Sequence, residues 1–217
     1  MGSTKARETL IQCDFDGTIT EEDVSFILLD AFADGDWRRL FRDYQEGRIS
    51  VGLFNTKAFA MVKADKQRLL EAMKGKVIVR PGFHELVAYC RTKDLRFVIV
   101  SNGLDFYIEA ILRDIGVENI EVFAAQTRFL PEGLQVQYIG PDGRQLNDGF
   151  KEAFASSFLR RGYHVVYVGN GPSDVSPAKQ CHHIFATGQL LASCKETKLN
   201  CTGFNDFHDI VRKLQVL

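Results

Sequence analysis

The segment Ile11–Thr20, IQCDFDGTIT, places two carboxylates directly after an apolar run. The run Thr9–Cys13 is too short for a typical helix and is closed by Gly17, so we interpret it as a buried β-strand. Side chains two residues apart on an extended chain point the same way, and Asp14 and Asp16 are therefore expected to approach one reacting centre from the carboxyl end of this strand. Two adjacent carboxylates repel unless a cation or a proton separates them, which favours a hard, oxygen-liganded metal such as Mg²⁺.

The composition excludes several classes of protein. A chain of 217 residues with 45% hydrophobic content is long enough for one compact core with an inserted subdomain. The net charge is -1 and the basic residues are scattered, so no nucleic-acid partner is predicted. The apolar runs are shorter than a membrane span, and residues 1–10 have no signal-peptide core. We therefore expect no membrane partner and a cytoplasmic location.

The cysteines are predicted to be reduced thiols. Their number is odd and their density is low for a secreted scaffold; they are Cys13, Cys90, Cys181, Cys194 and Cys201. The group Cys181-His182-His183, with two cysteines downstream, suggests zinc at first sight. Its spacing fits no familiar zinc pattern, so packing is the favoured role.

The pattern between residues 21 and 80 is helical throughout. Apolar residues recur at the spacing of one helix face, and no strand pattern interrupts the block. We predict helices over 21–33, 37–46, 51–62 and 66–74.

From Pro81 onward, predicted strands and helices alternate. The predicted strands are 95–100, 117–125, 164–168 and 184–186, and the predicted helices are 82–93, 105–115, 148–160 and 204–217. Residues 127–147 contain two short strand-like stretches and are interpreted as a small β-hairpin excursion. Such alternation is typical of an α/β fold with a doubly wound parallel sheet.

Three further stretches carry side chains suited to phosphate or metal. Ser101-Asn102-Gly103 follows a predicted strand and offers a hydroxyl and backbone amides to phosphate oxygens. Lys151 begins a predicted helix, and its ammonium can neutralise a phosphoryl group; only order and spacing single it out. Gly169–Asp174 follows another predicted strand and supplies Asn170 and Asp174.

The segment Asp14–Thr18 resembles the Asp-x-Asp-x-Thr nucleophile motif of the haloacid dehalogenase-like phosphatase superfamily, and the three later stretches follow in that superfamily's order. The resemblance covers nearly the whole chain. It implies a Rossmann-like catalytic core made of residues 1–20 and 81–217, with a small helical cap at 21–80 inserted after the first strand. One position departs from the pattern, because the family usually has Asp where this chain has Asn170. An amide oxygen still coordinates Mg²⁺, but one negative charge is lost and weaker metal affinity is expected.

The resemblance also implies a two-step hydrolysis of a phosphomonoester. Asp14 is expected to form an aspartyl-phosphate, while Asp16 protonates the leaving oxygen and then activates water. The expected ligands of Mg²⁺ are Asp14, the backbone carbonyl of Asp16, and Asn170, with Asp174 ordering bound water. The expected phosphate-binding residues are Ser101, Asn102, Gly103 and Lys151, with Thr18 in a supporting position.

The predicted partner is a small phosphorylated metabolite. The cap type and the Gly169–Asp174 segment look most similar to the branch that contains the methionine-salvage phosphatases for 2-hydroxy-3-keto-5-methylthiopentenyl 1-phosphate, with phosphoserine phosphatase as its nearest cousin. A carboxylate at the cap base binds the substrate amine in that cousin, and Asp23 either does the same or merely starts a helix. Phe26, Phe54, Phe59 and Met61 face either a thioether substrate or the core of the cap, and the core is favoured.

Two other classes stay open. A phosphotransferase or mutase on the same fold would keep both aspartates and use an acceptor alcohol in place of water. A weakened phosphometabolite-binding protein is supported only by Asn170, and retention of the nucleophile and its acid argues against it. The oligomeric state is not predicted by the sequence.

Overall fold

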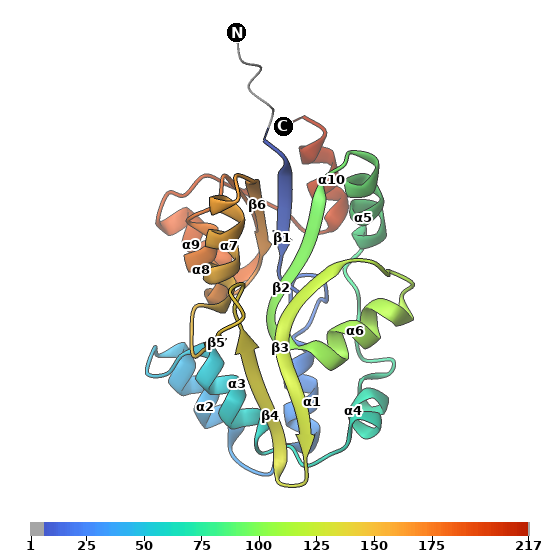
Figure 1. Cartoon of the computed structure of the whole chain (residues 1–217), viewed down its shortest axis with the longest axis vertical. Coiled ribbons are helices and arrows are strands. Elements are labelled where there is room, and N and C mark those ends of the chain that lie inside the picture. The colour runs from blue at the N-terminus through green and yellow to red at the C-terminus, as the bar shows by residue number, and fades with distance from the viewer. Residues whose placement is uncertain (1–6, 217) are drawn as a thin grey trace.

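The computed structural model describes residues 7–216 and consists of one eight-stranded sheet with helices on both faces. Part of the polar start of the chain, and Leu217 of the last predicted helix, lie outside the described residues. Figure 1 shows the sheet running the length of the molecule, with α5, α6 and α10 on one side and α7, α8 and α9 on the other.

The strands are ordered β5-β4-β3-β2-β1-β6-β7-β8 across the sheet. The pairs from β3 through β2, β1, β6 and β7 to β8 are parallel, whereas β4 pairs antiparallel with β3 and β5. Their bounds are β1 Thr9–Cys13, β2 Arg96–Leu104, β3 Glu121–Leu130, β4 Gly133–Ile139, β5 Gln145–Leu146, β6 His164–Gly169, β7 His183–Ala186 and β8 Cys201–Gly203. The predicted doubly wound α/β sheet is thereby confirmed.

The helices alternate with the strands, except for a block of four between β1 and β2. Their bounds are α1 Val24–Phe32, α2 Trp37–Gln45, α3 Val51–Phe59, α4 Lys66–Met73, α5 Phe83–Thr92, α6 Asp105–Asp114, α7 Phe150–Arg160, the 3₁₀ turn η1 Pro172–Asp174, α8 Val175–Ala178, α9 Gly188–Glu196 and α10 Phe207–Leu214. The sequence analysis missed η1, α8, α9 and β8. The central strand β1 is buried on both faces, which is why it reads as an apolar run.

Helices α1–α4 lie between β1 and β2 and are called the cap below, and short polar residues start three of them. The side chains of Asp36, Ser50 and Asp65 each accept a hydrogen bond from the backbone amide three residues later. Such N-caps satisfy amides that have no partner within the helix. These helices explain why the block showed no strand pattern.

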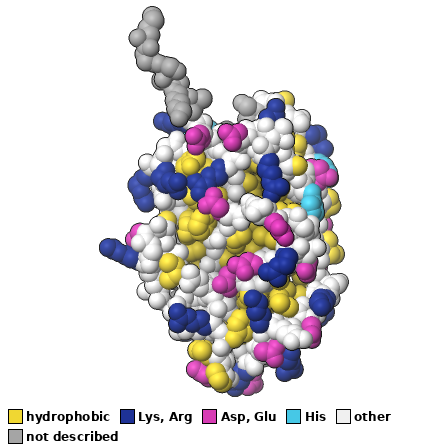
Figure 2. Space-filling view, turned by 45° about the vertical axis from the view of Figure 1, so that its right-hand side comes forward, with side chains coloured by type: hydrophobic (Ala, Val, Ile, Leu, Met, Phe, Trp, Pro, Cys, Tyr) yellow, Lys and Arg dark blue, Asp and Glu magenta, His cyan; other side chains and the backbone are white. Residues whose placement is uncertain are grey.

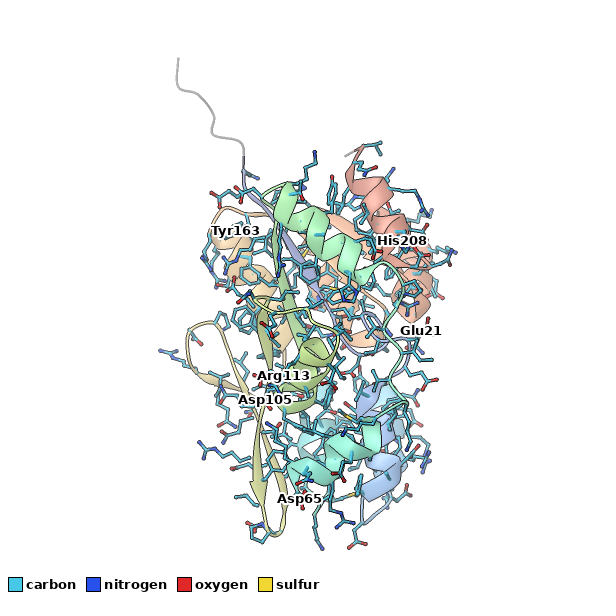
Figure 3. The ribbon with its side chains drawn as sticks, turned by 90° about the vertical axis from the view of Figure 1, so that its right-hand side faces the viewer. Glu21, Asp65, Asp105, Arg113, Tyr163 and His208 are labelled. Atoms are coloured by element: carbon cyan, nitrogen blue, oxygen red, sulfur yellow. The ribbon has the colours of Figure 1, made fainter. Side chains whose placement is uncertain are left out.

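Two chain segments connect the cap to the rest of the molecule and lie side by side. Thr20 and Val79 form an antiparallel bridge, and the amide of Glu21 donates to the carbonyl of Ile78 at 2.9 Å. Figure 3 shows Glu21 at this junction, between the end that carries His208 and the cap end that carries Asp65.

The hairpin of β3 and β4 is larger than the small excursion predicted. Strand β3 continues without interruption from its parallel pairing with β2 into antiparallel pairing with β4. The hairpin reaches the cap, where the amide of Leu134 donates to the carbonyl of Val62 at 3.1 Å. Local patterning could not reveal this, because the contact joins segments far apart in the sequence.

The distribution of surface charge and the cysteines give little further information about function. Figure 2 shows Lys and Arg interspersed with Asp and Glu over the face it displays. None of the helices within residues 7–216 has the length and apolar character needed to cross a membrane. The five cysteines are free thiols, and no group of three His, Cys, Asp or Glu side chains in the described part of the chain is arranged to hold a metal.

Candidate active site

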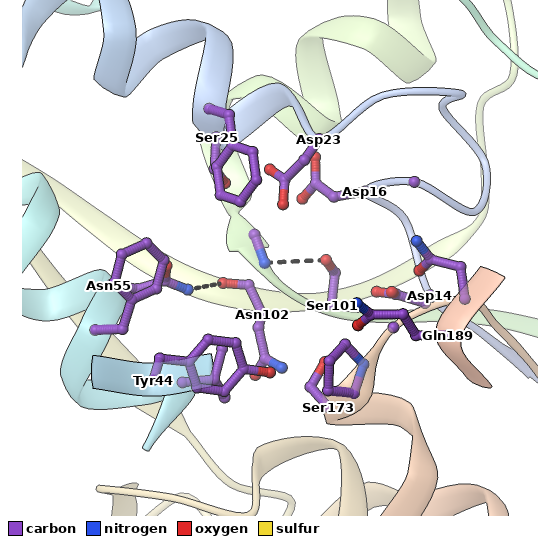
Figure 4. Close-up of a pocket in the computed structure, with 18 of the residues that line it drawn as sticks. Asp14, Asp16, Asp23, Ser25, Tyr44, Asn55, Ser101, Asn102, Ser173 and Gln189 are labelled. Carbon is purple, nitrogen blue, oxygen red and sulfur yellow. Dashed lines mark hydrogen bonds between the residues drawn. The ribbon is translucent and has the colours of Figure 1, made fainter. Parts of the chain in front are cut away.

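The candidate site lies where the strand order reverses, at the carboxyl ends of β1 and β6. Asp14 directly follows β1, and its amide donates to the carbonyl of Val168 in β6 at 2.9 Å. Ligands of doubly wound sheets bind at such a switch point. A cavity of about 370 Å³ opens there between the sheet and the cap. Figure 4 shows Asp14, Ser101 and Asn102 on its core side and Asn55 and Tyr44 on its cap side.

Lys151 occupies the floor of this site. Its Nζ lies 2.8 Å from Oδ1 of Asp14 and 2.7 Å from Oδ1 of Asp174, and its side chain is 2% exposed. Burial alone would lower the pKa of Lys151, but the two carboxylates outweigh burial and raise it. The lysine is therefore a fixed cation directly beside Asp14.

Asp174 lies behind Lys151 and does not line the cavity. Its Oδ1 accepts from Lys151 and from Tyr167, and its Oδ2 accepts from the amides of Asn170 and Gly171 at 3.0 and 2.8 Å. Burial would raise the pKa of Asp174, but the Lys151 ammonium and these hydrogen bonds hold it below its usual range. The expected metal-side position of Asp174 is therefore not seen in this geometry, because both of its oxygens hold the lysine and the loop.

Asn170 lines the cavity, whereas Thr18 does not. The Thr18 hydroxyl is fully buried and donates to Oδ1 of Asn170 at 3.0 Å. The turn that carries Thr18 is fixed by Arg80, which donates to the carbonyls of Gly17 and Thr18 at 3.0 and 2.8 Å. Thr18 is therefore placed to hold the amide of Asn170, and its expected supporting role in phosphate binding stays a prediction.

The segment Ser101-Asn102-Gly103 lines the cavity as expected, although it belongs to the end of β2 and not to a turn. The Gly103 amide donates to Oγ of Ser101 at 3.0 Å, which leaves the hydroxyl hydrogen of Ser101 for another acceptor. The Asn102 carbonyl accepts from Asn55 of cap helix α3 at 2.9 Å and from Tyr138 of β4 at 2.7 Å. The segment Ser101-Asn102-Gly103 is thus hydrogen-bonded to the cap and to β4.

Asp16 also lines the cavity, and both of its carboxylate oxygens are held. Oδ2 accepts from the hydroxyl of Tyr107 at 2.6 Å, and Oδ1 accepts from the amide of Val24 at 3.0 Å. Burial, followed by the nearby charge of Asp23, raises the pKa of Asp16 well above its usual value. A carboxyl whose pKa is raised holds its proton more tightly than a free aspartic acid does, as a general acid requires.

Asp23 faces the same cavity from the base of the cap. Its Oδ1 is buried and has no hydrogen-bond partner among the described residues, and its carboxylate caps no helix. Burial raises the pKa of Asp23 to about 6. A buried polar atom without a partner is costly, so Oδ1 of Asp23 is available to accept a hydrogen bond. Figure 4 shows its carboxyl beside that of Asp16.

Aromatic side chains of the cap form the opposite wall. Those lining the cavity are Phe26, Phe41, Tyr44 and Phe54. Ring centroids lie 4.8 Å apart for Phe26 and Phe41, and the rings of Tyr44 and Phe54 stack at 6.0 Å. Phe59 is fully buried, and Met61 packs against Gly35, so these two belong to the core of the cap as favoured.

The chemistry of the donor set fits a hard divalent cation. The Asp14 carboxylate, the Asp16 backbone carbonyl and the Asn170 amide would supply oxygen ligands, which Mg²⁺ prefers. Burial, followed by the charge of Asp174, raises the pKa of Asp14 to about 7 even though Lys151 opposes this. A further positive charge beside Asp14 would therefore stabilise the ionised form of its carboxylate.

Sequence reasoning missed four polar residues of the site, namely Asn55, Tyr107, Tyr138 and Tyr167. Each makes a hydrogen bond that joins elements distant in sequence or anchors an acid. One signal was present for Tyr167, which interrupts the run of valines in β6 with a polar hydroxyl. No comparable signal marked Tyr107 or Tyr138.

The family model described as haloacid dehalogenase-like hydrolase matches residues 11–179. The chain belongs to this family. A curated relative from Geobacillus thermodenitrificans, named 2-hydroxy-3-keto-5-methylthiopentenyl-1-phosphate phosphatase, is 30% identical over an alignment of 217 positions that covers 97% of each chain. A relative of the same name from Brevibacillus brevis is 26% identical and covers 97% of this chain and 96% of its own length. The protein is therefore an enzyme of the phosphatase type.

Solved structures show the same fold. A phospho-aspartyl intermediate analogue of phosphoserine phosphatase superposes with a TM-score of 0.70 at 19% identity, covering 95% of this chain and 99% of the other. A substrate-bound phosphoserine phosphatase gives a TM-score of 0.69 at 18% identity, covering 96% and 99%. At such identities the likeness supports the fold alone.

Proposed function

We propose that this enzyme is a Mg²⁺-dependent phosphatase acting on 2-hydroxy-3-keto-5-methylthiopentenyl 1-phosphate or a close analogue with an uncharged, thioether-bearing tail. The observation that carries the proposal is the cavity itself. Asp14, Lys151 and Ser101 lie at its core side, and aromatic rings of the cap lie at the other. A thioether packs favourably against aromatic rings, so the tail would face the cap while the phosphate faces Asp14.

In the proposed first step, a carboxylate oxygen of Asp14 attacks phosphorus as the bond to the leaving oxygen breaks. Asp16 gives its proton to that oxygen. In the second step, Asp16 takes a proton from water as the water oxygen attacks phosphorus, and this releases phosphate and restores Asp14. Lys151 and the Ser101 hydroxyl would hold the phosphoryl oxygens. Mg²⁺ held by Asp14, the Asp16 carbonyl and Asn170 would supply further positive charge at the phosphoryl group.

The same cavity offers no free cation, among its described residues, to the carboxylate group of phosphoserine. The acidic residues that line it are Asp14, Asp16, Glu21 and Asp23, and Lys151 is the one Lys or Arg among the described residues that line it. That lysine is already paired with Asp14 and Asp174. A substrate carboxylate would find no cation at the cap side, whereas a hydroxyl would find the unpartnered oxygen of Asp23.

The test measures kcat/KM for phosphate release from the methylthio substrate, phosphoserine and para-nitrophenyl phosphate, with and without Mg²⁺. We expect Mg²⁺-dependent turnover and a preference for the methylthio substrate over phosphoserine. Phe41→Leu should raise KM for the methylthio substrate severalfold, since an aromatic contact contributes about 1 kcal/mol. The matched control Phe32→Leu changes a cap phenylalanine that does not line the cavity. A preference for phosphoserine would overturn the substrate assignment, and transfer to an added alcohol without net hydrolysis would favour a phosphotransferase.

A further inference from the structure

A fully buried tyrosine outside the expected motifs is bonded to the proposed general acid. Tyr107 belongs to α6 in the core, and its side chain is 0% exposed. Its hydroxyl donates to Oδ2 of Asp16 at 2.6 Å. A short hydrogen bond to a carboxyl group both holds the group in one orientation and stabilises its charge.

The same hydroxyl is bonded to the cap. Oγ of Ser25, on cap helix α1, lies 2.9 Å from the hydroxyl oxygen of Tyr107. A phenol carries one hydrogen, which Tyr107 gives to Asp16, so the Ser25 hydroxyl is the donor in this second bond. The resulting chain of hydrogen bonds runs from Ser25 through Tyr107 to Asp16, and thus from the cap to the core.

Both oxygens of Asp16 therefore depend on α1. Oδ1 accepts directly from the amide of Val24, the first residue of α1, at 3.0 Å. Oδ2 depends on α1 through Tyr107 and Ser25. Displacement of α1 would remove the Val24 amide from Asp16. It would also remove the Ser25 hydroxyl that holds Tyr107.

The position of this pair next to the phosphate-binding segment explains the glycine at 103. A Cβ atom on Gly103 would lie 2.2 Å from Oδ2 of Asp16 and 2.2 Å from the hydroxyl of Tyr107. A side chain at residue 103 would therefore separate Asp16 from Tyr107. The carboxyl of Asp16 is packed directly over the strand end that carries Ser101.

We infer that Tyr107, supported by Ser25, is a positioning residue that aims the Asp16 carboxyl at the leaving-group oxygen when α1 of the cap is in place. This inference rests on the proposed function, because it assigns a role within the first chemical step. There Asp16 gives its proton to the oxygen whose bond to phosphorus breaks, and Tyr107 keeps its own proton throughout.

The test compares kcat/KM for two substrates that differ in their need for an acid. An alkyl phosphate needs protonation of its leaving oxygen, whereas para-nitrophenyl phosphate releases a stable phenolate. Because kcat/KM covers the steps through the first phosphoryl transfer, it reports leaving-group departure. We expect Tyr107→Phe to lower kcat/KM about tenfold or more for the fastest alkyl phosphate and much less for para-nitrophenyl phosphate. Asp16→Asn should show the same dependence more strongly.

Two further variants separate positioning from a structural effect. Ser25→Ala leaves the tyrosine ring in place and should give a smaller loss with the same leaving-group dependence. Adding it to Tyr107→Phe should cause little further loss, since both act through one chain of bonds. The control Tyr163→Phe removes a hydroxyl that bonds Arg96 and should change neither value. Figure 3 places Tyr163 at the end of the molecule opposite Asp65 of the cap.

Equal losses on both substrates, or no loss on either, would overturn the inference. If Tyr107→Phe does not fold, as judged by urea unfolding, Ser25→Ala alone decides between these outcomes. Failure of the proposed function is distinguished by the parent enzyme, which would then release no phosphate from either substrate.

Discussion

The Nζ atom of Lys151 lies 2.7 Å from Oδ1 of Asp174, in a pair whose side chains are 2% and 0% exposed. Removing one charge of a buried pair leaves the other poorly compensated. Asp174→Asn should therefore lower the free energy of unfolding by about 3 kcal/mol, measured by urea denaturation. It should also reduce turnover, because Lys151 is no longer held beside the phosphoryl site.

The control for this variant is the exposed pair of Arg144 and Asp142, with side chains 86% and 59% exposed. Asp142→Asn should change the free energy of unfolding by less than about 0.5 kcal/mol. If Asp174→Asn is as mild as this control, the buried network does not organise the site as described.

The amide of Asn170 is expected to limit the affinity for Mg²⁺. Asn170→Asp adds a negative charge to the proposed ligand set and should lower the half-saturating Mg²⁺ concentration about tenfold, or about 1.4 kcal/mol. The measurement is a Mg²⁺ titration of phosphate release. Asn119→Asp adds the same charge at an exposed position and should leave the titration unchanged. An unchanged or weaker affinity for Asn170→Asp would argue against residue 170 as a ligand.

Gly17 is required by its backbone and by its neighbour. Its φ is +72°, and a Cβ atom there would lie 2.2 Å from Nδ2 of Asn170. Gly143 has a similar φ of +79° with no atom within 4 Å of such a Cβ. Gly143→Ala should therefore cost about 1 kcal/mol of stability, and Gly17→Ala should cost more because Asn170 must also shift. Only Gly17→Ala should reduce kcat/KM, and equal activities of the two variants would contradict the role given to Asn170.

The histidines at the opposite end of the sheet predict a loss of stability in mild acid. The rings of His164 and His182 lie 4.3 Å apart, and burial, followed by the nearby His182, lowers the pKa of His164. The unfolded chain then binds more protons than the folded chain, so the free energy of unfolding falls as the pH drops below the ordinary histidine pKa of about 6.5. Above that pH His164 is uncharged in both the folded and the unfolded chain, so it makes no further contribution to the pH dependence of stability.

His164→Gln should remove part of this pH dependence. Urea unfolding of the parent and the variant at pH 7.5 and pH 5.5 measures it. The parent should lose more stability than the variant between these two conditions. Identical losses would show that His164 is as easily protonated in the folded protein as in the unfolded chain.

The sequence predicted the part of the site that depends on strand ends. Asp14 and Asn170 follow parallel strands, and Ser101 lies near the end of another. The ends of parallel strands meet at one edge of a sheet, so the convergence of these residues needed no tertiary information. Lys151 was selected by order along the chain, and the structure places its ammonium against Asp14.

The rest could not be predicted because it depends on packing between distant segments. Tyr107 and Asp16 are 91 residues apart, and Asn55 and Tyr138 are 83 residues apart. Asp174 and Thr18 were assigned by motif. The motif does not show that Asp174 accepts hydrogen bonds from Lys151 and Tyr167, or that Thr18 donates one to Asn170. The short helix α8 and the three-residue strand β8 carry too few residues for a periodic signal.

The central claim is that Asp14 carries the phosphoryl group. The measurement is mass spectrometry of the acid-quenched enzyme after mixing with its best substrate and Mg²⁺. The account predicts one added phosphoryl group on the peptide that contains Asp14, and neither adduct nor turnover for Asp14→Asn. Turnover retained by Asp14→Asn, or a phosphoryl group found on another residue, would contradict it.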